Sequence, residues 1–194
     1  TYKSRRATKP PTSAMRINQI FYSLQGEGVF TGVPAVFVRF SGCNRACDFC
    51  DTDFHAFTEM TEEEIVDAIN LYPAQHVVIT GGEPAMQVTE SLVAKIKATG
   101  RYVQIETNGS LPVPDNIDWV TCSPKEQPWL IQRVDELKIV FQGQYVEDIA
   151  SHFNAKAYCL QPCSCLNTED TILYILTHPR WRLSLQTHKL LEIQ

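Results

Sequence analysis

Residues 76–106 read HVVITGGEPAMQVTESLVAKIKATGRYVQIE, and this stretch decides the fold class. It opens with the run HVVIT (76–80), whose nearly continuous apolar character is typical of a strand buried on both faces. Apolar residues then recur on one helical face, at Val88, Leu92, Val93 and Ile96. Gly100 stands where a left-handed C-terminal cap belongs, and the run YVQIE (102–106) follows it. Strand, helix and strand in this order predict a parallel βαβ unit.

The same alternation extends along the chain. Further β-rich runs lie at residues 34–40, 118–121, 136–141, 157–160 and 182–185. Thr61 and Glu64 form a capping box ahead of a second helix, and Asn167 could cap a third that ends at Pro179. Seven strands and three or four helices are too few for a complete eight-fold barrel. We therefore predict an α/β fold, a shortened and partly open parallel (β/α) barrel with its functional loops at the carboxyl ends of the strands.

The composition fits one ordinary globular domain. The chain has 194 residues, of which 44% are hydrophobic and 20% charged. Residues 1–14 are basic and lack periodicity, so we expect a disordered tail or an expression scar there and a single domain over 15–194. No run approaches the roughly 18 consecutive apolar residues of a membrane-spanning helix. We expect no contact with a membrane.

Charge argues against nucleic-acid binding. Of the 17 basic residues, five fall within the first sixteen positions, so the rest of the chain carries 12 basic and 22 acidic side chains. A phosphate-binding groove needs clustered Lys and Arg, and we expect no nucleic-acid partner. No apolar segment follows the basic start as it would in a secretory signal, and we expect a cytoplasmic protein.

Three of the seven cysteines, Cys43, Cys47 and Cys50, fall within eight residues directly after the run 34–40. Three thiolates on one loop can hold a 4Fe–4S cluster and leave one iron open to a small molecule. A structural zinc site with His55 as fourth ligand uses the same residues and remains an alternative. By count alone, the remaining cysteines could hold a second metal centre. They are Cys122, Cys159, Cys163 and Cys165. Inside a strand, however, a free cysteine such as Cys159 behaves as a small buried hydrophobe.

The three-cysteine loop, with Phe49 before its last cysteine, resembles the signature of the radical S-adenosylmethionine (SAM) superfamily. The second hallmark of that superfamily is GGEP (81–84), which follows the run 76–80. The physical interpretation agrees, because two glycines let the backbone approach a ligand closely and Glu83 can accept from the ammonium of SAM.

More of the chain resembles one family of that superfamily, the 7-carboxy-7-deazaguanine synthases of queuosine and other 7-deazapurine pathways. The matching segments are residues 21–28, 31–35, 39, 50–52, 77–84, 105–109, 123–125, 161–162 and 183–189. The resemblance implies a lyase that contracts the ring of 6-carboxy-5,6,7,8-tetrahydropterin to 7-carboxy-7-deazaguanine with loss of ammonia. It also implies a 4Fe–4S cluster, SAM, Mg²⁺ bound at Thr52, a reducing donor of the flavodoxin or ferredoxin type, and a homodimer.

The resemblance assigns site residues one by one. Those expected around the substrate are Leu24, Gln25, Gly26, Arg39, Thr80 and His188. Those expected around SAM are Gly82, Glu83, Asn108, Ser123, Pro124, Lys125 and Gln161. The guanidinium of Arg39 suits a carboxylate, and His188 could bind that carboxylate or serve as a buried structural histidine. Glu27 is a further candidate for the substrate.

Two other functions compete with this interpretation. A glycyl-radical-enzyme activating enzyme would share the cluster loop and GGEP, but the segments 24–26 and 186–189 favour the lyase. A zinc-stabilised interaction domain would leave GGEP and the SPK sequence (123–125) without a role.

Overall fold

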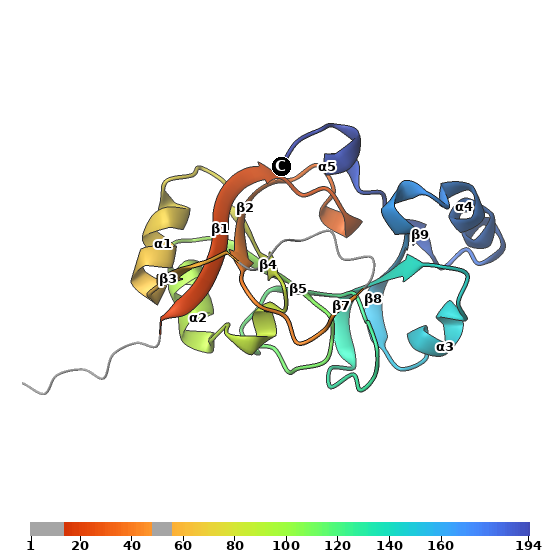
Figure 1. Ribbon diagram of the computed structural model, residues 1–194, viewed down its shortest axis with the longest axis horizontal. Helices are drawn as coiled ribbons and strands as arrows, with labels where there is room; N and C mark the ends of the chain where they lie inside the picture. Colours follow the sequence, from red (N-terminus) through yellow and green to blue (C-terminus); the bar gives the residue numbers. More distant parts are fainter. Residues whose placement is uncertain (1–13, 48–55) are drawn as a thin grey trace, which may run out of the picture.

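The structure, a computed structural model, describes residues 14–47 and 56–194. Within these residues nine strands form one sheet in the order β3-β1-β2-β4-β5-β6-β7-β8-β9 (Figure 1). The strands are β1 (Met15–Leu24), β2 (Pro34–Phe40), β3 (Thr58–Met60), β4 (His76–Gly81), β5 (Tyr102–Thr107), β6 (Trp119–Cys122), β7 (Arg133–Phe141), β8 (Asn154–Pro162) and β9 (Arg182–Leu183). The tail expected at the N-terminus lies outside the described residues apart from Ala14.

The seven strands predicted from sequence are the seven that pair in parallel, from β2 through β4 to β9. In the described part of the chain β3 and β9 form the two edges, so the sheet stays open. The predicted shortened, partly open (β/α) barrel is confirmed. Its β9 is shorter than expected and spans only Arg182–Leu183.

Two antiparallel strands extend the barrel at one edge, and the sequence prediction missed both. β1 pairs antiparallel with β2 and with β3, and its register shifts between Ile17 and Gln19. β1 is buried at Met15, Ile17 and Phe21 and exposed or half-buried between them. This alternation is typical of an antiparallel strand with one face toward solvent. Continuous apolar character, which marks several of the predicted strands, is absent from β1.

The described residues form five helices besides the sheet. They are α1 (Glu62–Asn70), α2 (Glu90–Ala98), α3 (Val146–Ala150), α4 (Thr168–Thr177) and α5 (Thr187–Leu190), with single 3₁₀ turns η1 (Gly28–Phe30), η2 (Pro84–Met86) and η3 (Cys163–Cys165). In Figure 1, α1 and α2 lie at the β1–β3 end and α3 and α4 at the β8–β9 end. No helix in the described ranges is long and apolar enough to cross a membrane.

The predicted helix signals are confirmed at α1 and α2. Thr61 accepts from the Glu64 N–H at 3.2 Å, and the Glu64 carboxylate accepts from the Thr61 N–H at 2.7 Å. Gly100 has a φ of +86° after α2. At α4 the position was right but the mechanism was wrong. The Asn167 side chain does not cap the helix, because its oxygen accepts from the Cys163 N–H and its amide donates to the Phe141 carbonyl, both at 2.8 Å.

Strands β5 and β7 each separate an apolar face from a polar one. On β7, Leu137 and Ile139 belong to an apolar core outside the barrel, while Glu136 and Lys138 are buried on the opposite face. On β5, Val103 and Ile105 likewise pack outward and Gln104 is buried inward. The barrel interior is therefore polar along β5 and β7, although these strands are buried on both faces, and this interior leads to the carboxyl ends of the strands.

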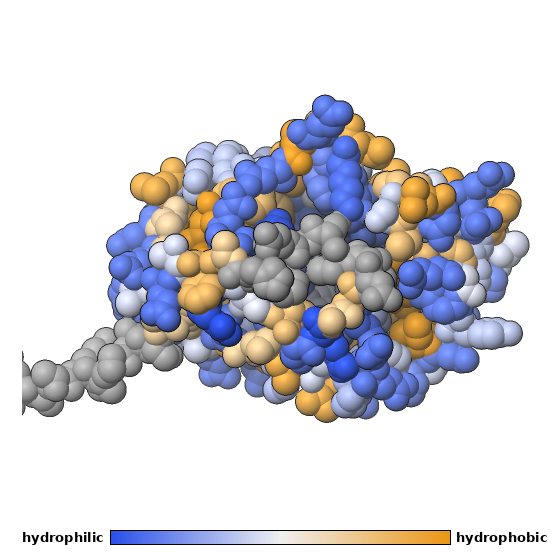
Figure 2. All heavy atoms as spheres, viewed as in Figure 1, coloured by the Kyte–Doolittle hydropathy of each residue, from blue (hydrophilic) through white to orange (hydrophobic). Residues whose placement is uncertain are grey.

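The outer surface mixes apolar and polar side chains (Figure 2). α4 contributes little to the core, because Thr171 is its one fully buried residue, while Leu173 and Leu176 are 56% and 73% exposed.

Candidate active site

Two cavities open at the carboxyl ends of the parallel strands and divide the predicted site residues between them. The first, which we call the cysteine cavity, is lined by the predicted cofactor residues Cys43, Cys47, Gly82, Asn108, Ser123, Lys125 and Gln161. The second, the arginine cavity, is lined by the predicted substrate residues Leu24, Gln25, Gly26, Arg39, Thr80 and His188. Four residues line both cavities and form a shared wall, namely Glu27, Thr80, Glu106 and Gln186. Segments far apart in sequence thus build one continuous site.

The glycines after β4 allow the cysteine loop to pack against the strand ends. Gly82 donates to the Phe40 carbonyl at 3.1 Å, and Glu83 donates to the Gly42 carbonyl at 2.9 Å. A Cβ on Gly82 would collide with the Gly42 carbonyl and lie 3.0 Å from Cβ of Cys43. The backbone here therefore requires glycine because the cysteine loop packs against it.

The donor atoms at this loop fit an iron–sulfur cluster. Cys43 and Cys47 both line the cavity, and thiolates are the ligands that such clusters use. Cys50, the Mg²⁺ candidate Thr52 and the zinc-ligand candidate His55 lie outside the described residues.

Glu83, which the resemblance places near SAM, is held by donors of its own chain. It is fully buried, and its carboxylate accepts from the Thr107 hydroxyl at 2.8 Å, the Asn108 N–H at 2.7 Å and the Ala85 N–H at 3.0 Å. Burial raises the pKa of Glu83, although these hydrogen bonds oppose the rise. Glu83 does not line either cavity, and its hydrogen bonds join the end of β4 to the end of β5. Pro124 also lines neither cavity.

The other predicted cofactor residues have defined local partners. The Asn108 amide donates to the Asn44 side chain at 3.1 Å, which ties the cysteine loop to the end of β5. The Lys125 ammonium donates to the Ser123 hydroxyl at 2.9 Å, and burial lowers the pKa of Lys125. These groups bring an amide, a hydroxyl and a cation to the wall of the cysteine cavity.

The arginine cavity combines a cation with aromatic surface. Arg39 lies on β2 with its guanidinium carbon 5.5 Å from the centre of the Phe21 ring, and Phe21 stacks on Phe37 with 4.9 Å between ring centroids. The hydroxyl and N–H of Thr187 both donate to the Gly26 carbonyl at 2.9 Å, which holds α5 and His188 against Gly26. This arrangement suits a flat, anionic ligand.

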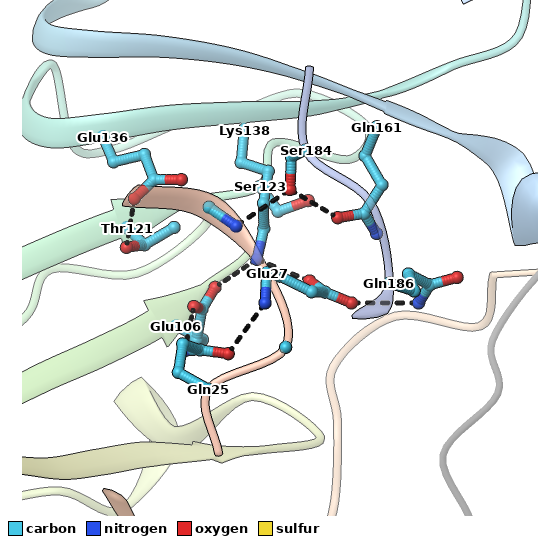
Figure 3. Close-up of polar contacts among 12 residues, drawn as sticks. Gln25, Glu27, Glu106, Thr121, Ser123, Glu136, Lys138, Gln161, Ser184 and Gln186 are labelled. Carbon is cyan, nitrogen blue, oxygen red and sulfur yellow. Dashed lines mark hydrogen bonds and ion pairs between the residues drawn. The ribbon is translucent and has the colours of Figure 1, made fainter. Parts of the chain in front are cut away.

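The shared wall contains an ion network that the sequence prediction missed (Figure 3). The Lys138 ammonium lies 2.6 Å from a Glu27 oxygen and 3.0 Å from a Glu106 oxygen, and the Lys138 side chain is only 5% exposed. Burial alone would raise the pKa of Glu27, but Lys138 outweighs it and the pKa falls to about 2. Burial raises the pKa of Glu106 to about 7, with Lys138 opposing the rise and Glu136 and Glu27 adding to it. The available signal was the pair of charged residues at alternate positions 136 and 138 of the otherwise apolar run 136–141.

Gln104 holds the other oxygen of Glu106. Its amide donates to Glu106 at 3.0 Å and to the Thr121 hydroxyl at 3.1 Å. The Gln104 oxygen lies 2.8 Å from Nε2 of His76. Because that oxygen can only accept, His76 must carry its proton on Nε2 to form this bond. Burial lowers the pKa of His76, which favours the neutral ring.

The four cysteines outside the cluster loop do not form a second metal centre. Cys122 and Cys159 are buried, and burial raises the pKa of both thiols, that of Cys159 to about 12. Across residues 14–47 and 56–194, no three His, Cys, Asp or Glu side chains are grouped to hold a metal ion. The prediction of Cys159 as a buried hydrophobe is confirmed.

Comparisons with known proteins agree with this geometry. The Radical SAM superfamily model matches residues 37–120. A 7-carboxy-7-deazaguanine synthase of Bacteroides thetaiotaomicron is 53% identical over 92% of this chain and 98% of its own, and one of Bordetella pertussis is 40% identical over 93% and 99%. The crystal structure of QueE from Escherichia coli superimposes with a TM-score of 0.79 at 30% identity, covering 89% of this chain and 93% of that one. The chain therefore belongs to the 7-carboxy-7-deazaguanine synthase family within the radical SAM superfamily.

Proposed function

We propose that the protein is a radical SAM lyase that converts 6-carboxy-5,6,7,8-tetrahydropterin into 7-carboxy-7-deazaguanine with loss of ammonia, in 7-deazapurine (queuosine) biosynthesis. The observation that carries the proposal is the pair of joined cavities. Cysteine thiols line one of them, while a guanidinium beside aromatic rings lines the other. The names of the relatives support the same reaction.

In the cysteine cavity, Cys43, Cys47 and Cys50 would hold the 4Fe–4S cluster that radical SAM enzymes use. The residues that would bind SAM are Gly82, Asn108, Ser123, Lys125 and Gln161. When bound, the cluster and SAM supply the one-electron chemistry that removes a hydrogen atom from the substrate. Ser123 and Lys125 would bind polar groups of SAM, and the backbone at Gly82 can approach it closely.

In the arginine cavity, Arg39 would pair with the substrate carboxylate, and Phe21 and Phe37 would support the guanidinium. Gln25, with its amide 3.4 Å from Glu106, would help to present donors and acceptors to the pterin edge. Thr80 lies on the wall between substrate and SAM. A Mg²⁺ ion held at Thr52 would neutralise charge on the substrate carboxylate.

The proposal includes a cytoplasmic location, a homodimer and a reducing donor of the flavodoxin or ferredoxin type, all of which rest on the family. The activating-enzyme alternative is not favoured, because the similar proteins named above are 7-carboxy-7-deazaguanine synthases.

The test is anaerobic reconstitution with iron and sulfide, followed by reductant, SAM, Mg²⁺ and the carboxytetrahydropterin. We expect 7-carboxy-7-deazaguanine and one equivalent of ammonia. Arg39→Lys should raise KM for the pterin about tenfold or more, because a bidentate pair is lost. Arg133→Lys, at an exposed position on β7, is the matched control and should leave KM unchanged. Deoxyadenosine release without deazaguanine would exclude the proposed substrate.

A further inference from the structure

Lys138 occupies a singular place among the described residues, because it joins carboxylates that face both cavities. Its side chain comes from the middle of β7 and reaches Glu27, which follows β1, and Glu106, near the end of β5. Glu27 and Glu106 are half-buried on the shared wall, while Lys138 is almost completely buried. Figure 3 shows Lys138 between Glu27 and Glu106, the two carboxylates that line both cavities.

The charges inside this part of the barrel do not balance without Lys138. The titratable groups that act on Glu106 are Lys138 and Glu136 from β7 and Glu27 from the segment after β1. The charge of Glu106 also acts on the Cys122 thiol of β6. Arg39 and His188 line the arginine cavity, as Glu106 does. Three carboxyl groups therefore surround the Lys138 ammonium, and the buried Lys125 ammonium also acts on Glu27. Removal of the Lys138 ammonium would leave two of the carboxyl groups, Glu27 and Glu106, without a cation in contact.

Hydrogen bonds to both carboxylate oxygens orient Glu106. One oxygen accepts from Gln104 at 3.0 Å, and the other accepts from Lys138 at 3.0 Å. Gln186 donates to Glu27 at 2.9 Å and so anchors the far side of the network. Two side chains therefore link the Glu106 carboxylate to the loop of residues 25–28: Gln25, whose amide donates to Glu106 at 3.4 Å, and Lys138, which supplies the charged contact.

We propose that Lys138 is a positioning residue, which fixes the Glu106 carboxylate on the wall between substrate and SAM and governs its protonation state during turnover. This inference rests on the proposed function only in the kinetic experiment described below, and the titration of Glu106 can be measured without it. Since Lys138 attracts the ionised carboxylate, its loss shifts the titration of Glu106 upward. The sign is the same whether turnover needs the ionised or the protonated carboxyl.

The first measurement is an infrared titration of protonated carboxyl groups in the anaerobically purified protein. Wild type should show a group titrating near neutral pH that is absent in Glu106→Gln. In Lys138→Met this group should titrate about 1 to 3 pH units higher. Lys138→Arg should retain a midpoint close to that of wild type. Glu27→Gln should move the midpoint downward, because a neighbouring negative charge is removed.

The second measurement is the pH dependence of kcat for deazaguanine formation. In wild type, one limb of the kcat–pH profile should report the ionisation of Glu106, and this limb should be absent in Glu106→Gln. It should move to higher pH in Lys138→Met and return to the wild-type position in Lys138→Arg. Lys156→Met, which removes an exposed lysine paired with Asp135 on the outside of the barrel, should leave the limb unmoved.

An unshifted carboxyl midpoint in Lys138→Met overturns the inference, as does an upward shift in Glu27→Gln. If Lys138→Met does not fold, the titrations of Glu27→Gln and Lys138→Arg decide alone. A shifted infrared midpoint without any deazaguanine product supports the coupling of Lys138 to Glu106 and counts against the proposed function, so the two failures are distinguishable.

Discussion

Glu83→Ala tests whether the acid of the GGEP segment binds the cofactor or supports the fold. The carboxylate accepts from three donors, of which the Asn108 N–H and the Thr107 hydroxyl belong to buried residues. A buried donor left without an acceptor costs about 1–3 kcal/mol. Two such donors predict a loss of about 2–6 kcal/mol, and relief of the buried charge reduces the upper value. We expect about 2–4 kcal/mol, a large part of the stability of a typical domain.

The assay is equilibrium urea unfolding of anaerobically purified protein. Glu83→Gln keeps one acceptor oxygen and should lose less, about 1–3 kcal/mol. Glu59→Ala, on the exposed strand β3, is the matched control and should stay within about 0.5 kcal/mol of wild type. An unfolding free energy for Glu83→Ala within about 1 kcal/mol of wild type, together with loss of SAM binding, would refute the scaffold role.

Three further changes have definite outcomes. Gly26→Ala places a Cβ against the His188 ring and should raise KM for the pterin about tenfold, measured by steady-state kinetics; an unchanged KM would show that α5 can shift freely. Gly81→Ala forces a side chain onto a φ of +130° and against the Phe40 backbone, and should lower the unfolding free energy by about 2 kcal/mol or more in thermal unfolding. A wild-type melting temperature would contradict that geometry. The pKa of Glu106 lies at about 7 in the fold against 4.5 ordinarily, so the native state holds the proton more tightly; relative to Glu106→Gln, wild type should lose about 3 kcal/mol as pH rises from 4.5 to 7. Parallel pH profiles for the two proteins would exclude a raised pKa at Glu106.

The sequence predicted the parallel part of the fold because its strands are buried by helices on one side and by the barrel interior on the other. That double burial makes runs such as 34–40 and 76–80 nearly continuous in apolar residues. The sequence prediction missed β1 because half of its residues face outward. Its apolar residues therefore alternate with polar ones and do not form a continuous apolar run. The sequence prediction also missed α3 and α5, because helices of five and four residues are too short to show a helical repeat of apolar residues.

The resemblance named candidate residues for the site, but only the structure gave the hydrogen bonds and ion pairs between them. The residues assigned from the resemblance separate into two cavities, as a cofactor and a substrate require, with Glu83 and Pro124 as the exceptions. The sequence leaves two roles open for Glu83, because a carboxylate beside two glycines is suited both to binding a ligand and to accepting from the backbone. The distinction depends on what the next strand brings near it, here Thr107 and Asn108.

By itself the sequence indicated the chemistry through its resemblance to one family, since that resemblance rests on the cysteine spacing, the glycines and other local patterns that need no long-range contact to be recognised. Only the tertiary structure decided which polar residues meet. Lys138 touches Glu27, 111 residues away in sequence, and Glu106, 32 residues away. The parallel register of β5, β6 and β7 brings these side chains into one barrel interior. These contacts set the pKa values of Glu27 and Glu106, because the burial and the neighbouring charges that shift them exist only once the strands lie side by side.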